Sequence, residues 1–247
     1  MKQKPSATTV AADSSTAPSI PMVPAGLPTT PSISQRSIKP AAQMKVQASL
    51  NACVLIDRTG SSDQFRIGIP RTVEIIFDQA SARAQAVHVT VWTGGDEDYG
   101  EQPILHTDRG TVEQALSDVG ALRYGGGGDA DESHLSSIER VVEATAWSDE
   151  RRTRNALIAI VNANTKPAKS GRSAREIGKD LKKRNIFLCL VCEPYPLFDE
   201  LVEAAGGLQF VISNDPSAEE LQKVSSRVAA SIVASLSAGG TMPMGGV

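Results

Sequence analysis

The chain has 247 residues, 40% of them hydrophobic, which is enough to bury one sizeable core. Its formal net charge is −3 and its Lys and Arg residues are scattered, so we expect neither nucleic acid nor an anionic membrane as a partner. Because no apolar run is long enough to cross a bilayer and the three cysteines form no disulfide framework, we predict a cytoplasmic protein.

Composition divides the chain into three parts. Residues 1–46 are rich in Ser, Thr, Pro and Ala and hold few large apolar side chains, so they are predicted to be a disordered tail. Residues 47–237 carry regular apolar patterns and are predicted to form one domain. Residues 238–247 are rich in Gly and are predicted to be a flexible C-terminal tail.

Within the predicted domain, apolar strands alternate with amphipathic helices. The strands are expected at about residues 52–56, 86–92, 104–107, 156–161, 186–192 and 208–212. Helices are expected to begin at about residues 70, 111, 135, 174, 198 and 216, where apolar residues recur at helical spacing. Asn214 or Asp215 is expected to cap the last helix, with Pro216 in its first turn.

This alternation predicts the fold class. Strand–helix–strand units imply right-handed crossovers, so we expect a doubly wound α/β fold. Its sheet should have about six strands, be mostly parallel and carry helices on both faces. The short strand 104–107 after Pro103 is expected at an edge, as the one antiparallel strand.

The pair Cys189-x-x-Cys192 has a spacing that can indicate zinc binding or redox chemistry. Here it lies in an apolar run with the character of a buried strand. Since successive side chains of a strand alternate between faces, the two thiols should point in opposite directions. We therefore interpret them as small core residues.

The first predicted strand ends in Asp57-Arg58-Thr59-Gly60-Ser61. Ligands of doubly wound folds bind beyond the carboxyl ends of the strands, and three oxygen-bearing side chains can converge there on a cation. Hard oxygen donors suit Mg²⁺ above all. The alternative is that the hydroxyls satisfy loop amides and that Asp57 accepts backbone N–H groups.

A second loop runs through four glycines, Gly125 to Gly128, into Asp129. Bare backbone can approach another group closely, and Asp129 adds a carboxylate, which makes it a candidate metal ligand. Asp131 and Glu132 precede a predicted helix, where acids complement the helix dipole without binding an ion. His134 is interpreted as a surface residue of the first helical turn.

Together these two loops resemble the von Willebrand factor type A (VWA) domain family. One branch has the first motif Asp-x-Thr-Gly-Ser, which Asp57 to Ser61 match. The same branch carries a run similar to Gly-Gly-Gly-Gly-Asp-x-Pro-Glu-Ser, which Gly125 to Ser133 follow except that Asp131 replaces proline. The resemblance extends from about Gln47 to Leu236 and implies the family's Rossmann-like fold.

The resemblance also implies a metal-ion-dependent adhesion site for Mg²⁺ or Mn²⁺. Carried over by motif position, Thr59 and Ser61 would bind the cation directly, Asp129 would contribute from the second loop, and Asp57 would act through water. The third loop departs from the family pattern, because Asn162 stands where an aspartate is usual. Asn162 offers a carbonyl oxygen but no charge.

In the family, such a cation binds an acidic side chain of a partner protein, without catalysis. The resemblance therefore implies a protein-binding adaptor whose partner presents an Asp or Glu. Intracellular bacterial members often work beside AAA+ ATPases, kinases, phosphatases or peptidases of stress and conflict systems.

Two alternatives stay open. Asp57-Arg58-Thr59-Gly60-Ser61 is also similar to the nucleophile motif of haloacid dehalogenase phosphotransferases, in which the aspartate attacks phosphate with the help of magnesium. Such an enzyme needs a second acidic cluster late in the sheet and a lysine at the end of a strand. Lys166 is the only lysine near a suitable strand end. The other alternative is a VWA domain whose metal site is vestigial.

Overall fold

The computed structural model describes residues 46–66, 68–213 and 215–238. The two predicted tails lie almost wholly outside these ranges. Within the described part of the chain, no helix is both long enough and apolar enough to cross a membrane.

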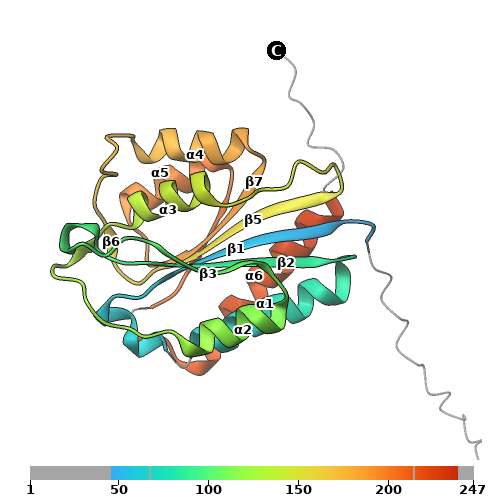
Figure 1. Ribbon diagram of the computed structural model, residues 1–247, viewed down its shortest axis with the longest axis horizontal. Coiled ribbons are helices and arrows are strands. Elements are labelled where there is room, and N and C mark those ends of the chain that lie inside the picture. Colours follow the sequence, from blue (N-terminus) through green and yellow to red (C-terminus); the bar gives the residue numbers. More distant parts are fainter. Residues whose placement is uncertain (1–45, 67, 214, 239–247) are drawn as a thin grey trace, which may run out of the picture. The chain divides into compact units, whose positions relative to one another are not determined.

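The centre of the fold is a six-stranded sheet in the order β3-β2-β1-β5-β7-β8 (Figure 1). Its strands are β1 (Ser49–Asp57), β2 (Val87–Gly94), β3 (Ile104–Gly110), β5 (Thr153–Ile160), β7 (Ile186–Cys192) and β8 (Leu208–Val211). All neighbours are parallel except β2 and β3. The predicted α/β fold with one antiparallel edge strand is confirmed.

Helices cover both faces of this sheet, as Figure 1 shows. They are α1 (Gly68–Arg83), α2 (Val112–Ala121), α3 (His134–Ala144), α4 (Ala174–Lys183), α5 (Pro196–Ala205) and α6 (Ala218–Ala238). One core lies under α1, α2 and α6, and the other under α3, α4 and α5. Strand residues alternate between the cores: Val54 packs in the first and Leu55 in the second. Cys189 and Cys192 likewise belong to opposite cores, as predicted.

The last helix begins later than the sequence suggested. Its first residue is Ala218, and the Ser217 hydroxyl accepts a hydrogen bond from the Glu220 amide at 3.1 Å. Ser217 therefore caps the helix and Pro216 precedes the cap, so the prediction of Asp215 as cap and Pro216 in the first turn is wrong. A serine cap satisfies an amide that a more distant aspartate would leave free. Asn214, the other predicted cap, lies outside the described residues.

A short parallel pair, β4 (Asp131–Glu132) with β6 (Asn164–Thr165), was not predicted. Two residues are too few to show a strand period, so only the tertiary structure reveals this pairing. The Lys166 amide continues it by donating to the Glu132 carbonyl at 2.9 Å. The pair ties the loop before α3 to the loop after β5.

The topology determines where a site can form. From β1 the chain proceeds to β2 and β3 on one side, and later to β5, β7 and β8 on the other. The order of connection therefore reverses between β1 and β5, and ligand sites of doubly wound sheets lie at such a point. Asp57 ends β1, and Asn162 follows β5, whose Ile160 is in register with Ile56.

Candidate functional site

The loop after β1 contributes a carboxylate and two hydroxyls. Asp57 is 1% exposed, and its Oδ1 accepts a hydrogen bond from the Thr59 amide at 2.9 Å. The Thr59 and Ser61 hydroxyl oxygens lie 3.0 Å apart. This contact of Asp57 agrees with the alternative interpretation of the loop, whereas within the described residues the two hydroxyls pair with each other rather than with loop amides.

The loop after β5 meets this hydroxyl pair. Asn162 is buried, and its Oδ1 accepts a hydrogen bond of 3.4 Å from the Ser61 hydroxyl. Residues about a hundred positions apart thus converge because parallel strands β1 and β5 are neighbours and end at the same edge.

The glycine loop closes over the same place. Gly126 and Gly127 have φ angles of 87° and 72°, a region that favours glycine. The Gly60 amide donates to the Gly126 carbonyl at 3.2 Å. A Cβ added to Gly127 would lie 2.8 Å from Glu132 Oε1 and 3.4 Å from Thr59 Cβ. The loop backbone therefore packs directly between Thr59 and Glu132.

We expect Gly127→Ala to destabilise the protein by about 1–3 kcal/mol, because it adds a strained φ angle to a contact with Glu132. Gly125→Ala is the matched control in the same loop, since a Cβ there meets nothing within 4 Å. Urea unfolding of both variants measures the difference. Equal losses would show that the loop makes no close approach at Gly127.

Glu132 is a site residue that the sequence analysis missed. It is 3% exposed, and its Oε2 has no hydrogen-bond partner among the described residues. Burial, followed by the charges of Asp57, Asp96 and Glu101, raises the pKa of Glu132 to about 7, although Lys166 opposes the shift. It is therefore a buried carboxylate close to others rather than a complement to a helix dipole.

His134 is also buried, at 1% exposure, so the interpretation of it as a surface residue is wrong. Its Nε2 lies 3.7 Å from Asp57 Oδ2, beyond hydrogen-bond distance. Burial lowers the pKa of His134 although the charges of Asp57 and Asp96 oppose it, so the ring is neutral near pH 7. The start of α3 turns toward the protein interior because the Leu135 amide donates a hydrogen bond to the Thr165 hydroxyl on β6. Nothing in the local sequence indicates this long-range contact.

Asp129, the predicted ligand of the second loop, points to a different group. Its carboxylate lies 3.0 Å from Lys166 Nζ, and its side chain is 48% exposed. No contact among the described residues joins it to Thr59 or Ser61. Its role as a metal ligand stays a prediction, whereas Glu132 and Thr59 both lie close to the backbone of Gly127.

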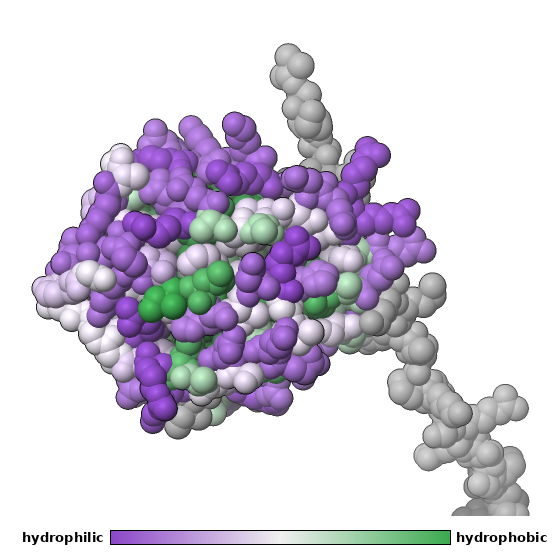
Figure 2. All heavy atoms as spheres, viewed as in Figure 1, coloured by the Kyte–Doolittle hydropathy of each residue, from purple (hydrophilic) through white to green (hydrophobic). Residues whose placement is uncertain are grey.

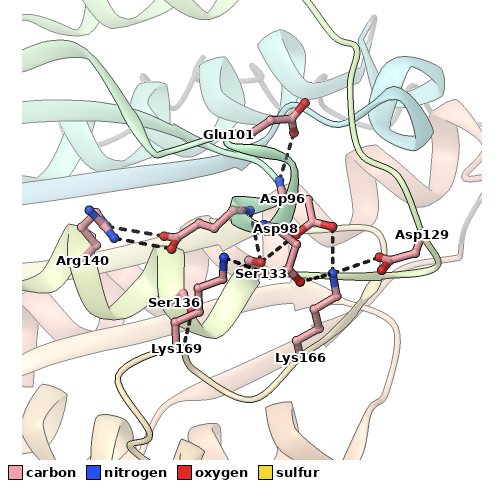
Figure 3. A network of polar contacts seen from close by, with 10 residues as sticks. Asp96, Asp98, Glu101, Asp129, Ser133, Ser136, Arg140, Lys166 and Lys169 are labelled. Atoms are coloured by element: carbon pink, nitrogen blue, oxygen red, sulfur yellow. Dashed lines mark hydrogen bonds and ion pairs between the residues drawn. The ribbon is translucent and has the colours of Figure 1, made fainter.

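Lys166 is the centre of a polar network (Figure 3). Its ammonium lies 2.8 Å from Asp96 Oδ2 and 2.7 Å from Asp98 Oδ2, in addition to Asp129. Burial by itself would raise the pKa of Asp96, but hydrogen bonds from Lys166 and Ser133 keep it below its usual value. Ser133 donates to Asp96 Oδ1 at 2.8 Å and so holds the start of α3 against the loop after β2.

The site thus gathers hard oxygen donors at one rim of the sheet. The Ser61 hydroxyl contacts both the Thr59 hydroxyl and the Asn162 amide oxygen. The buried carboxylates Asp57 and Glu132 each keep one oxygen without a partner within the described ranges. Buried polar atoms are rarely left unpaired without a reason. No three His, Cys, Asp or Glu side chains of the described chain cluster as a metal site by themselves, so a cation here would depend on the hydroxyl and amide oxygens as well.

Comparisons with known proteins support the fold. No protein-family model and no curated protein matches this sequence. Among solved structures, the chain is similar to the VWA domain of SpRpn10, with 15% identity and a TM-score of 0.57 over 80% of this chain and 99% of that one. It is also similar to proximal thread matrix protein 1 from the mussel byssus, with 11% identity and a TM-score of 0.56. That match covers 76% of this chain and 47% of the mussel protein. The fold is therefore VWA-like.

Proposed function

We propose that this VWA-like domain is a non-catalytic protein-binding module that binds an acidic side chain of a partner through a divalent cation, Mg²⁺ or Mn²⁺. Thr59, Ser61 and Asn162 would supply neutral oxygens, and Glu132 and Asp57 would supply negative charge. This set replaces Asp129 of the sequence-based prediction with Glu132.

The observation that carries the proposal is a pair of buried carboxylates, Asp57 and Glu132, at the same rim of the sheet as the hydroxyl pair Thr59 and Ser61. Burial, followed by the charge of Asp57, destabilises the ionised state of Glu132 and raises its pKa. A divalent cation would neutralise both charges and satisfy their free oxygens. Octahedral oxygen coordination that retains some water leaves a position for a carboxylate from outside.

Calorimetric titration with Mg²⁺ or Mn²⁺ tests the cation. We expect saturable binding to the wild type, weakened at least about tenfold by Ser61→Ala and by Glu132→Gln, because each removes an oxygen ligand or a charge. Asp129→Asn is the matched control, since it removes a carboxylate that Lys166 already pairs.

Each other outcome of that titration has a definite meaning. Loss of binding in Asp129→Asn but not in Glu132→Gln would restore Asp129 as the ligand. No binding of either ion to the wild type would overturn the cation site and favour a vestigial one, with the fold unaffected.

The partner is tested by capture with immobilised wild-type protein, with and without chelator, followed by identification of the bound protein. We expect capture to need the cation and to fail with Ser61→Ala. An AAA+ ATPase, a kinase or phosphatase, or a peptidase of a bacterial stress or conflict system is the proposed kind of partner. Capture that survives both the chelator and Ser61→Ala would contradict the cation bridge.

Among the residues that the structure describes, no contact of Asp57 favours the phosphotransferase alternative. In the described chain Lys166 reaches Asp96, Asp98 and Asp129 rather than Asp57. Release of phosphate from an aryl phosphate, abolished by Asp57→Asn, would overturn the non-catalytic proposal.

A further inference from the structure

A separate cavity of about 300 Å³ lies between α2, the strands β2 and β3 and the residue that follows β1. Its polar lining comes from Arg58, Thr93, His106, Asp118 and Arg123. None of these side chains belongs to the proposed cation site, although Arg58 lies between Asp57 and Thr59 in the chain. The cavity therefore needs its own explanation.

Two guanidinium groups line this cavity without a countercharge in contact. Neither Arg58 nor Arg123 forms an ion pair with any described residue. The Nε of Arg58 is buried and has no hydrogen-bond partner there either. A buried guanidinium donor that lacks an acceptor is costly, and an anion would supply the acceptor.

The other polar groups of the cavity compensate only part of this positive charge. Asp118 is the single acid in the lining, and its Oδ2 already accepts the Thr107 hydroxyl at 2.5 Å. Burial lowers the pKa of His106 although Asp118 opposes the shift, so the ring is neutral near pH 7. It lies 2.9 Å from the Thr93 hydroxyl. Two positive charges thus face one negative charge.

Apolar side chains complete the wall. Ile104 of β3 is 44% exposed and Leu122 follows α2, and both line the cavity. On the face seen in Figure 2, a small green area lies amid purple in the region that β3 crosses in Figure 1. A ligand here can therefore combine an anionic group with a short carbon chain.

We propose that this cavity binds a phosphate monoester, with its oxyanion held by Arg58 and Arg123. A planar guanidinium matches two phosphate oxygens at once, and two guanidiniums suit a doubly charged group better than a carboxylate. The volume exceeds that of a phosphate group, so the ester's carbon atoms would contact Ile104 and Leu122. The ester is either a phosphorylated side chain of a protein or a small free phosphate ester.

The test is a titration with inorganic phosphate, O-phosphoserine, a phosphoserine peptide and acetate at low ionic strength, followed by NMR or calorimetry. Chelator is present throughout, so the result does not depend on the proposed cation. We expect saturable binding of phosphate and phosphoserine, with acetate weaker. Tighter binding of the peptide than of free phosphoserine would identify a phosphorylated protein side chain as the ligand. Equal binding of the two would identify a small free phosphate ester as the ligand.

Arg58→Gln and Arg123→Gln should each weaken phosphoserine at least about tenfold, since each removes charge-assisted hydrogen bonds. Arg123 is exposed, so its variant should fold like the wild type. Arg151→Gln, an exposed arginine before β5 and outside the cavity, is the matched control and should bind normally. Absent binding, unchanged affinity in the double variant, or acetate as tight as phosphate would overturn the proposal.

Discussion

Replacing Lys166 by methionine is expected to lower the free energy of unfolding by about 3–5 kcal/mol at pH 7. The Lys166 ammonium lies 2.8 Å from a carboxylate oxygen of Asp96, whose side chain is 0% exposed. Burial opposes the charge of Lys166, but its hydrogen bonds to Asp96, Asp98 and Asp129 raise its pKa above the usual value and keep it protonated. Methionine preserves the length of the side chain and leaves a buried negative charge unpaired.

Urea unfolding of the variant measures this loss, with Lys169→Met as the matched control. Lys169 pairs with Asp98 where both side chains are nearly half exposed, so its removal should cost no more than about 1 kcal/mol. Adding Asp96→Asn to Lys166→Met should restore part of the stability, because the buried charge is then absent. Similar losses for the two lysine variants would contradict the central role of Lys166.

Glu132→Gln is expected to stabilise the cation-free protein by about 2–3 kcal/mol at pH 8 and to change it little at pH 4. The pKa of Glu132 is about 7 in the folded state, against a usual value of 4.5. The folded state therefore binds this proton more tightly than the unfolded state. The resulting stability is fully present below pH 4.5 and is lost as the pH rises through about 7, whereas glutamine has no charge to lose.

The measurement is urea unfolding of wild type and variant between pH 4 and pH 8 in the presence of chelator. The lowered pKa of His134 makes the folded state less stable as the pH falls below the usual value of 6.5, which is opposite in sign to the effect of Glu132. His134 is present in both proteins. The difference between the two curves therefore isolates Glu132. A difference that does not change with pH would show that Glu132 ionises normally, and would remove the buried-carboxylate argument for the cation.

The sequence by itself determined the fold class, because strand and helix periods are local and their alternation admits few topologies. It also indicated the end of β1 as a candidate site, because Asp57 and its neighbouring hydroxyls follow an apolar run directly. The antiparallel edge strand was predictable from its short length and Pro103. The cap of α6 was not, since Ser217, Asp215 and Asn214 have similar cap propensities and only the hydrogen bond to the Glu220 amide distinguishes Ser217.

The tertiary structure alone decided which acids lie together. Asp129 and Glu132 are three positions apart in an acidic loop, and nothing local separates a surface carboxylate from a buried one. The two-residue pairing of β4 with β6 turns Glu132 inward against the backbone of Gly127, while Lys166, which continues β6, pairs with Asp129. The burial of Glu132 and the pairing of Asp129 both depend on contacts between segments more than thirty residues apart. A local sequence pattern carries no information on the free energy of such contacts.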